Sequence, residues 1–430
     1  MVTAPRRSTT VALVALSFAL IAFFTLRPSP AIVMTPTFCI FCGALGGVDF
    51  VLNVLLFVPL GLSLQWTTGR WHMSAIIGLT TTLVIEGLQW RIITGRDASL
   101  GDLLANTLGT LLGVWIATAV FRWLNATGVT ARRYAEAWGI AAVVVIIVSG
   151  WLLQPVVPRN PQWVQWTPVR LNTEPFKGHL ISVELKTRTI RGVERVEASE
   201  AFDTLARSLS VRANIRSPGG PTRLPAIIVR IANDKEEGFT LGQSGQSAVF
   251  RTYIAAAKLR LRPILVGLDR AFGSSERIEA DADFTIEGTS TTQYIFLRRS
   301  GAEGVSDVRV PRTVGLAWAL LLPQDVALDG RWWVANAVWL AALMIPVSFF
   351  TMRSAKSTED EAGRGIAWRA LLIVLATLGA TAATPLSGLA AGEWLGVLAG
   401  IAAGWQLERW TAPFGHADLK NPTRMRSILS

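Results

Sequence analysis

The sequence predicts an α-helical integral membrane bundle of about eight transmembrane helices with an inserted extracytoplasmic all-β sandwich domain. Three observations favour this fold class. The 430 residues are 51% hydrophobic and only 17% charged, and the mean hydropathy is +0.40. Long apolar stretches occur near both ends of the chain, whereas the middle contains short alternating runs with charges of both signs. A chain of this composition must contact lipid.

Eight apolar stretches approach the length of about 20 residues that a helix needs to cross a bilayer. They cover residues 10–26, 49–66, 74–90, 99–121, 137–153, 331–351, 367–384 and 389–408. The first stretch follows Arg6 and Arg7, as in a signal peptide, but no clean small-x-small cleavage site precedes Pro28 and Pro30. We therefore expect a retained helix.

The basic residues indicate the orientation, because Lys and Arg are retained in cytoplasmic loops. A cytoplasmic N-terminus places most basic loop residues inside, and five crossings then put the middle of the chain outside. The expected inside groups are Arg70, Arg122, Arg132, Arg133, Arg353, Lys356, Arg364, Lys420, Arg424 and Arg426. The formal net charge of +11 then reflects loops that meet anionic lipid headgroups, and we expect no nucleic-acid partner.

The middle segment is predicted to form strands. Residues 208–215 alternate apolar and polar side chains, which is the period of a half-buried strand. Many strands separated by turn residues, without long helices between them, indicate a sandwich. Further expected strands cover residues 180–185, 226–231, 238–242, 248–254, 278–286 and 292–297. The apolar run Val314–Leu322 is too short to span lipid, so we expect it to be the last strand.

Residues suited to metal or redox chemistry are sparse. Cys39 and Cys42 form a single Cys-x-x-Cys without an adjacent βαβ pattern. We expect packed apolar cysteines there, with a redox pair as the alternative. His72, His179 and His416 lack metal-ligand spacing, so we expect no metal site and no cofactor.

Polar residues recur at helical spacing inside three of the apolar stretches. A charge in a membrane span costs roughly 2.5–3.5 kcal/mol on insertion scales, so such residues are candidates for function. Each pair is spaced i,i+3 or i,i+4 and shares one helix face. Because consecutive helices alternate in direction, the pairs should meet near the outer leaflet. We predict one outward-opening binding pocket, with a purely structural hydrogen-bonded clamp as the alternative. Its residues are Asp49, Asn53, Glu86, Gln89, Arg96, Asp102 and Asn106.

These residues follow an ordered pattern. It runs Asp49-x3-Asn53-x3-Phe57-x-Pro59-x-Gly61, then Glu86-x2-Gln89, then Arg96-x2-Ser99-x2-Asp102-x3-Asn106-x2-Gly109-x3-Gly113. Over roughly residues 10–125 the chain resembles the VanZ-like family. The resemblance implies a multi-pass protein of the bacterial plasma membrane and a link to resistance to the glycopeptide antibiotic teicoplanin.

Two shorter similarities concern the rest of the chain. The segment 238–243 followed by 249–251 resembles the concanavalin-like (laminin G-like) sandwiches attached to some VanZ-like proteins. Near the end, Gly392-Glu393-x-Leu395-x4-Gly400-x3-Gly404 echoes Gly101-Asp102-x-Leu104-x4-Gly109-x3-Gly113, which suggests a degenerate repeat without a counterpart of Asn106.

The expected domains follow from these patterns. They are a VanZ-like transmembrane domain (1–125), a fifth transmembrane helix with its connection (126–158), the extracytoplasmic sandwich (159–326), the C-terminal transmembrane helices (327–412) and a basic cytoplasmic tail (413–430).

Three function classes compete. We favour a non-enzymatic envelope protein whose partners are membrane lipid, a surface glycan bound by the sandwich, and a lipid-linked precursor or glycopeptide-like ligand bound by the pocket. The alternative is a membrane enzyme in which Asp49, Glu86 or Asp102 acts as acid or base on a lipid-linked sugar or phosphate. A transport path is disfavoured, because the polar residues are restricted to the outer half of the helices.

Overall fold

The computed structural model describes residues 6–411, apart from 29–38, 95–97, 159–161, 171, 187, 204, 217–220, 234–236, 273–282, 303 and 356–361. The chain divides into two compact units. One unit comprises residues 1–142, 341–376 and 397–430 and contains the first four helices. The other comprises residues 143–340 and 377–396 and contains both sheets. The predicted domain boundaries remain a prediction.

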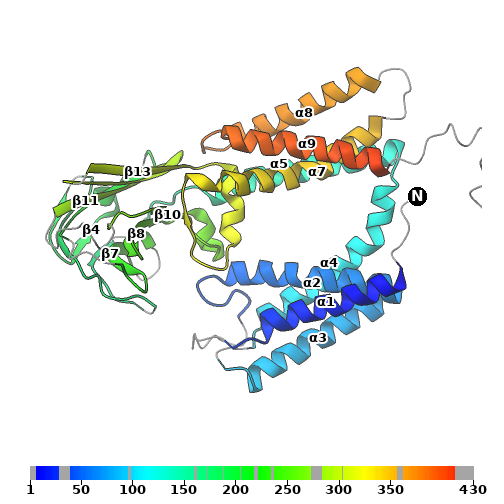
Figure 1. Cartoon of the computed structure of the whole chain (residues 1–430), viewed down its shortest axis with the longest axis horizontal. Coiled ribbons are helices and arrows are strands. Elements are labelled where there is room, and N and C mark those ends of the chain that lie inside the picture. The colour runs from blue at the N-terminus through cyan, green and yellow to red at the C-terminus, as the bar shows by residue number, and fades with distance from the viewer. Residues whose placement is uncertain are drawn as a thin grey trace, which may run out of the picture. The chain divides into compact units, whose positions relative to one another are not determined.

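In the described part of the chain, a long helix lies at each of the eight predicted apolar stretches (Figure 1). These helices are α1 (Arg7–Thr25), α2 (Gly46–Thr68), α3 (Trp71–Arg91), α4 (Leu100–Leu124), α5 (Gly128–Leu152), α7 (Trp333–Ala355), α8 (Ala362–Ala382) and α9 (Ala391–Thr411). Among the described residues, five helices are long and apolar enough to cross a membrane, namely α1, α2, α4, α5 and α7. Membrane crossing by α3, α8 and α9 stays a prediction.

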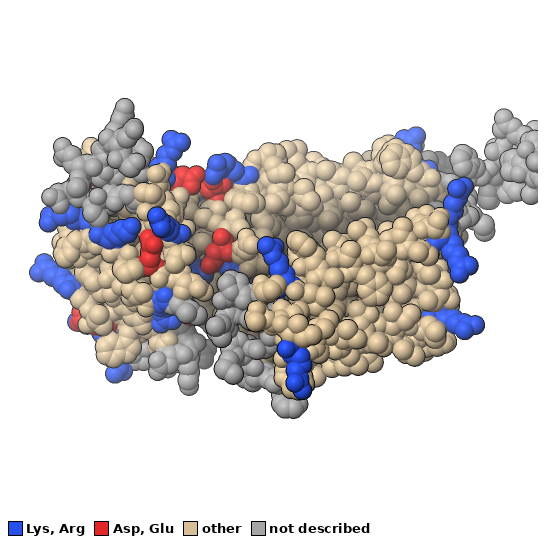
Figure 2. All heavy atoms as spheres, turned by 60° about the horizontal axis from the view of Figure 1, so that its bottom comes forward, with Lys and Arg blue, Asp and Glu red and all other residues tan. Residues whose placement is uncertain are grey.

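The outward surface of helices α1–α4 is apolar. Large exposed side chains there include Phe23, Leu55, Leu83, Leu108 and Trp115. On the face shown in Figure 2, Lys and Arg gather near the ends of the helical part, and the described surface between them is uncharged. An apolar surface of this extent is unsuited to water, and it fits the hydrocarbon region of a bilayer.

Glycines bring α2 and α4 into backbone contact. An added Cβ at Gly109 would lie 2.2 Å from the Val54 carbonyl oxygen, and one at Gly113 would lie 2.1 Å from that of Val58. Small residues at this spacing allow helices to approach closely where hydrophobic association is absent. The close approach holds the polar residues of α2 and α4 next to each other.

The middle of the chain is rich in sheet. Its strands are β1 (Gln162–Trp166), β2 (His179–Glu184), β3 (Thr189–Ile190), β4 (Glu194–Val196), β5 (Phe202–Asp203), β6 (Ser208–Arg216), β7 (Ala226–Ala232), β8 (Glu237–Ser244), β9 (Ser247–Thr252), β10 (Leu265–Leu268), β11 (Asp283–Ser290), β12 (Tyr294–Gly301), β13 (Gly304–Pro311) and β14 (Ala327–Leu328). One sheet has the order β14-β10-β9-β8-β7-β1-β4. The other has the order β13-β12-β11-β6-β2-β3, with β5 beside β6. The strand pairs are antiparallel except β10 with β14, which are parallel.

The buried faces of the two sheets meet in an apolar core. Val211, Ala213 and Ile215 of β6 are fully buried, as their alternation predicts. Gly288 of β11 faces the Phe250 ring of β9, where an added Cβ would lie 2.8 Å from the ring. Two sheets packed face to face fit the predicted sandwich arrangement.

Two strand predictions are wrong in detail. The run Val314–Leu322 is not a strand, because Val314–Leu321 forms a 3₁₀ helix, η2. Nearly every side chain of η2 is buried, so no alternation was available to distinguish strand from helix. The strand expected at 278–286 begins in undescribed residues, and β11 instead runs to Ser290.

Several short elements were not predicted from the sequence. They are the strands β1, β3, β4, β5, β10, β13 and β14, the short helix α6 (Ala198–Ala201), and the 3₁₀ helices η1 (Ala255–Leu259) and η3 (Gly330–Trp332). Most are too short to show a period. The eight-residue β13 pairs with β12 alone at the sheet edge, and most of its side chains are exposed.

Candidate functional site

Ser99 and Asp102 build the start of α4. The Ser99 hydroxyl accepts the backbone N–H of Asp102 at 2.9 Å and donates to Asp102 Oδ2 at 2.9 Å. Ser99 is the N-cap of the helix, a position where a hydroxyl satisfies one of the free N–H groups of the first turn. The cap therefore fixes the Asp102 carboxylate at the start of α4.

Side chains from α2 and α3 join this carboxylate. Asn53 Nδ2 of α2 donates to Asp102 Oδ1, and the Ser99 N–H donates to Glu86 Oε2 of α3 at 3.0 Å. Ser99 thus connects two carboxylates. Glu86 and Ser99 are buried, whereas Asn53 and Asp102 are half-buried. We call Asn53, Glu86, Ser99 and Asp102 the Asp102 cluster.

The other residues of the predicted pocket are placed differently. Gln89 Nε2 donates to the Thr25 carbonyl oxygen at the end of α1, at 2.9 Å. Asn106 lies one turn below Asp102 with 2% of its surface exposed, and its Oδ1 has no hydrogen-bond partner in the described part of the chain. Asp49 is exposed, one turn before Asn53. Arg96 lies outside the described residues.

The structure brings together Asn53, Glu86 and Asp102, and it directs Gln89 to α1. Ser99 was present in the family pattern but was not among the predicted pocket residues. Its Ser-x-x-Asp spacing before an apolar run is the signal of an N-cap, and that signal could have identified it. Whether these residues form a binding pocket stays a prediction.

The cysteine pair lies beside the Asp102 cluster. Cys39 and Cys42 are joined by a disulfide with a Cα–Cα distance of 5.6 Å, so the expectation of merely packed cysteines is wrong. The Cys39 carbonyl oxygen accepts the N–H of Gly101, the residue before Asp102, at 3.1 Å. An added Cβ on Gly101 would lie 2.1 Å from the Ile40 oxygen, so this contact requires glycine.

A second candidate site lies on the outward face of the β13–β3 sheet. It is a shallow hollow of about 550 Å³ across β2, β6, β11 and β12. Its lining residues are Ile181, Ser182, Asn214, Ile215, Asp283, Phe284, Thr285, Ser300 and Gly301. Alternation along β6 predicted which side chains point outward, but it could not predict the hollow, which depends on four strands.

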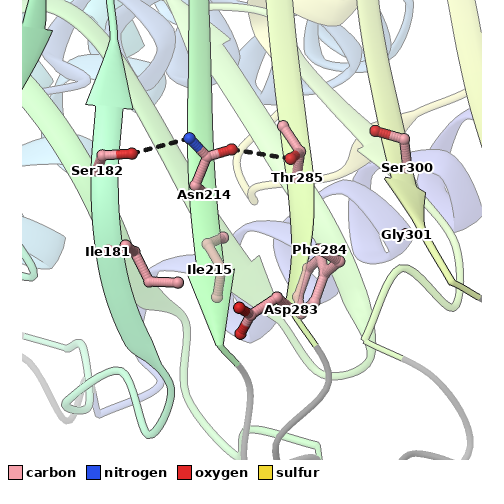
Figure 3. A pocket seen from close by; sticks show the side chains of 9 residues that line it. All are labelled: Ile181, Ser182, Asn214, Ile215, Asp283, Phe284, Thr285, Ser300 and Gly301. Atoms are coloured by element: carbon pink, nitrogen blue, oxygen red, sulfur yellow. Dashed lines mark hydrogen bonds between the residues drawn. The ribbon is translucent and has the colours of Figure 1, made fainter.

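Figure 3 shows a row of polar groups across this hollow. Asn214 Nδ2 donates to Ser182 Oγ and Thr285 Oγ1 donates to Asn214 Oδ1, both at 2.8 Å. At the rim, Arg216 Nε donates to Asp283 Oδ1 at 2.7 Å, and this hydrogen bond lowers the pKa of the Asp283 carboxyl. Hydroxyl, amide and carboxylate groups therefore line one open surface.

Five described helices that are long and apolar enough to cross a membrane, in a chain that also contains a sheet-rich region, indicate a membrane protein. Residues 4–122 match the VanZ/LLP1 family, and this segment of the chain is a VanZ-like domain. The match contains all seven predicted pocket residues. No curated protein and no solved structure matches the chain, so the concanavalin-like similarity of the sheets stays a prediction.

Proposed function

We propose that the protein is a VanZ-like factor of the bacterial cell envelope that binds a lipid-linked precursor or a glycopeptide-like ligand at the Asp102 cluster. In this proposal the cluster faces the outer leaflet, the sheet-rich region is extracytoplasmic, and binding contributes to teicoplanin resistance. The observation that carries the proposal is the junction of three helices at two carboxylates, Glu86 and Asp102, bridged by Ser99.

The partial exposure of the Asp102 cluster favours ligand binding over a purely structural role. Hydrogen bonds that only clamp helices together are expected to be shielded from water, because water competes for their donors and acceptors. Asn53 and Asp102 are only half-buried, and Asp49 one turn away is exposed. The carboxylates can accept hydroxyl or N–H groups of a ligand, which sugars and peptides both offer.

The hollow on the sheet supports a second part of the proposal, the binding of a surface glycan. Ser182, Asn214, Thr285 and Ser300 present hydroxyl and amide groups on adjacent strands, with the Asp283 carboxylate at the rim. Neighbouring sugar hydroxyls both donate and accept, and such a row can satisfy both kinds of bond.

Asp102→Asn in the full chain is expected to remove binding while the protein remains folded. The amide preserves the size of the side chain but replaces an acceptor oxygen with a donor. The measurements are binding of teicoplanin and of a polyprenyl-linked sugar to the purified protein, with teicoplanin susceptibility of expressing cells. We expect at least a roughly tenfold loss of affinity, which corresponds to about 1.4 kcal/mol.

Glu136→Gln is the matched control, because Glu136 is an exposed carboxylate of α5 that pairs with Arg132. Full binding by Asp102→Asn would contradict the proposal. Loss of folded protein in Asp102→Asn would favour a clamp. Conversion of the lipid-linked sugar by the wild type, abolished in Asp102→Asn with expression intact, would favour the membrane enzyme.

The proposed orientation predicts an all-or-none labelling result. A cysteine at Ser244, which is exposed at the end of β8, should react with an impermeant thiol reagent applied to intact cells. A cysteine at Thr130, which is exposed at the start of α5, should react only after the membrane is opened. The native cysteines form a disulfide and give no background. Labelling of Thr130→Cys alone in intact cells would reverse the orientation.

A further inference from the structure

Helices α7 and α9 pack in the same way as α2 and α4. In both pairs, glycines of the second helix touch carbonyl oxygens of the first, at the same spacing. The equivalent distances from an added Cβ are Gly109 to Val54 O (2.2 Å), Gly113 to Val58 O (2.1 Å), Gly400 to Ala341 O (2.5 Å) and Gly404 to Ile345 O (2.5 Å). The contacting residues of α2 have their counterparts 287 positions later in α7. The contacting glycines of α4 have theirs 291 positions later in α9.

The same two offsets relate further features. Pro59 lies inside α2 and Pro346 inside α7, which are both 23 residues long. An added Cβ on Gly61 would lie 2.0 Å from the Thr110 oxygen, and at the equivalent place Ser348 Oγ donates to the Ile401 oxygen at 2.7 Å. Coincidental glycine spacing would not reproduce the proline and the serine contact as well.

The order of elements repeats too. Helices α2, α3 and α4 follow α1, and α7, α8 and α9 follow α5. In the first set, the connection from α1 to α2 contains the cysteine pair. In the second set, both sheets lie between α5 and α7. The sheet-rich region therefore occupies the first connection of the second set.

Each set holds a carboxylate at the start of its last helix. Asp102 and Glu393 are both third residues of their helices, and the offset of 291 relates them. Asp102 accepts an amide group of α2 and the hydroxyl of Ser99. Glu393 Oε1 accepts Nδ2 of Asn336 in α7 at 2.8 Å; by the offset of 287, Asn336 is the counterpart of Asp49, one turn before Asn53. The counterpart of Ser99 is Ala390, which has no hydroxyl.

The missing hydroxyl is supplied by the sheet-rich region. Thr313 Oγ1, which follows β13, donates to Glu393 Oε1, and an added Cβ on Gly315 would lie 2.3 Å from the same oxygen. Trp318 Nε1 of η2 donates to Asn336 Oδ1 at 2.8 Å. Glu393 is consequently 1% exposed, whereas Asp102 is half-buried.

We propose that α5 and α7–α9 are a second copy of α1–α4, and that residues 313–318 of the sheet-rich region close the carboxylate site of this copy. The Asp102 carboxylate stays half-buried, whereas the site at Glu393 is closed by the chain itself. Glu393 anchors the sheet-rich region and is unavailable for ligand binding. This inference goes beyond the proposed function and does not depend on the ligand at Asp102.

Matched substitutions test the closure by hydrogen exchange of the full chain in lipid nanodiscs, measured by mass spectrometry. Glu393→Gln replaces the carboxylate that accepts from Thr313 and Asn336 with an amide, which has one acceptor oxygen fewer. Thr313→Val removes the donating hydroxyl. Both should raise the exchange rate of peptides covering 312–322 about tenfold and leave 98–110 unchanged. Asp102→Asn and Ser99→Ala should raise the exchange rate of peptides covering 98–110 and leave that of 312–322 unchanged.

Thr313→Val removes a single hydrogen bond, so it remains informative if Glu393→Gln does not fold. Unchanged exchange at 312–322 in Thr313→Val would overturn the anchoring role. Faster exchange in both 98–110 and 312–322 in all four variants would show that the sites at Asp102 and Glu393 are not independent, and it would overturn the proposal. Faster exchange at 312–322 only in the Glu393 and Thr313 variants would support the proposal.

Discussion

Replacing Arg312 with leucine is expected to destabilise the unit that contains the sheets by about 3–5 kcal/mol, because three buried acceptors lose their donor at about 1–3 kcal/mol each. Arg312 is 0% exposed. Its guanidinium donates to the carbonyl oxygens of Leu153 and Thr291, at 2.8 and 3.1 Å, and to Ser290 Oγ at 2.8 Å. Leucine would leave these three acceptors buried without a donor.

The position of Arg312 explains why a cation is tolerated there. Leu153 directly follows α5, so its carbonyl lies at the negative end of that helix dipole. Burial lowers the pKa of Arg312 to about 9, which still leaves the group charged at neutral pH. The Arg312 carbonyl oxygen also accepts the Ser387 N–H at 3.1 Å, so this residue joins the end of α5, the β11–β12 turn and the approach to α9.

The measurement is the apparent unfolding temperature of the purified full chain, with the folded fraction from size-exclusion chromatography. Arg312→Lys should recover only part of the loss, because an ammonium cannot reproduce the planar arrangement of donors. Arg216→Ala is the control. Its ion pair with Asp283 lies on the exposed sheet face, and such pairs contribute little. An unfolding temperature of Arg312→Leu equal to that of the control would refute the role assigned to Arg312.

Gly113→Ala is expected to destabilise the helical unit by about 1–3 kcal/mol through overpacking. The new methyl group would lie 2.1 Å from the Val58 oxygen, and backbone atoms of α2 cannot rotate away as a side chain can. The α2–α4 pair would have to separate, and the hydrogen bond between Asn53 and Asp102 would lengthen with it. Heat-induced aggregation and folded yield in detergent measure this effect.

Gly87→Ala is the matched control, because Gly87 also lies within a long helix but an added Cβ meets nothing within 4 Å. Alanine there should be neutral or stabilising, since it favours the helix by roughly 0.5–1 kcal/mol. Gly404→Ala should resemble Gly113→Ala if α7 and α9 repeat α2 and α4. A Gly404→Ala variant as stable as Gly87→Ala would argue against equivalent packing in the two pairs.

Local patterns named some of the residues that lie together at the start of α4. The family pattern named Asn53, Glu86 and Asp102, and i,i+4 spacing put the pairs on common helix faces. Spacing along one helix cannot state which neighbouring helix a side chain faces. That is why Gln89 was assigned to the pocket although it bonds to the end of α1.

The sequence by itself determined the long helices, the sheet-rich middle and the family of residues 4–122. Hydrophobic periodicity and composition can be recognised within segments of about twenty residues. Only the tertiary structure decided that Val314–Leu321 is a 3₁₀ helix and that the Cys39–Cys42 disulfide lies against α4. It alone showed that Thr313 reaches Glu393, 80 residues further along the chain. Contacts between distant residues depend on how whole elements pack, and no local period encodes that packing.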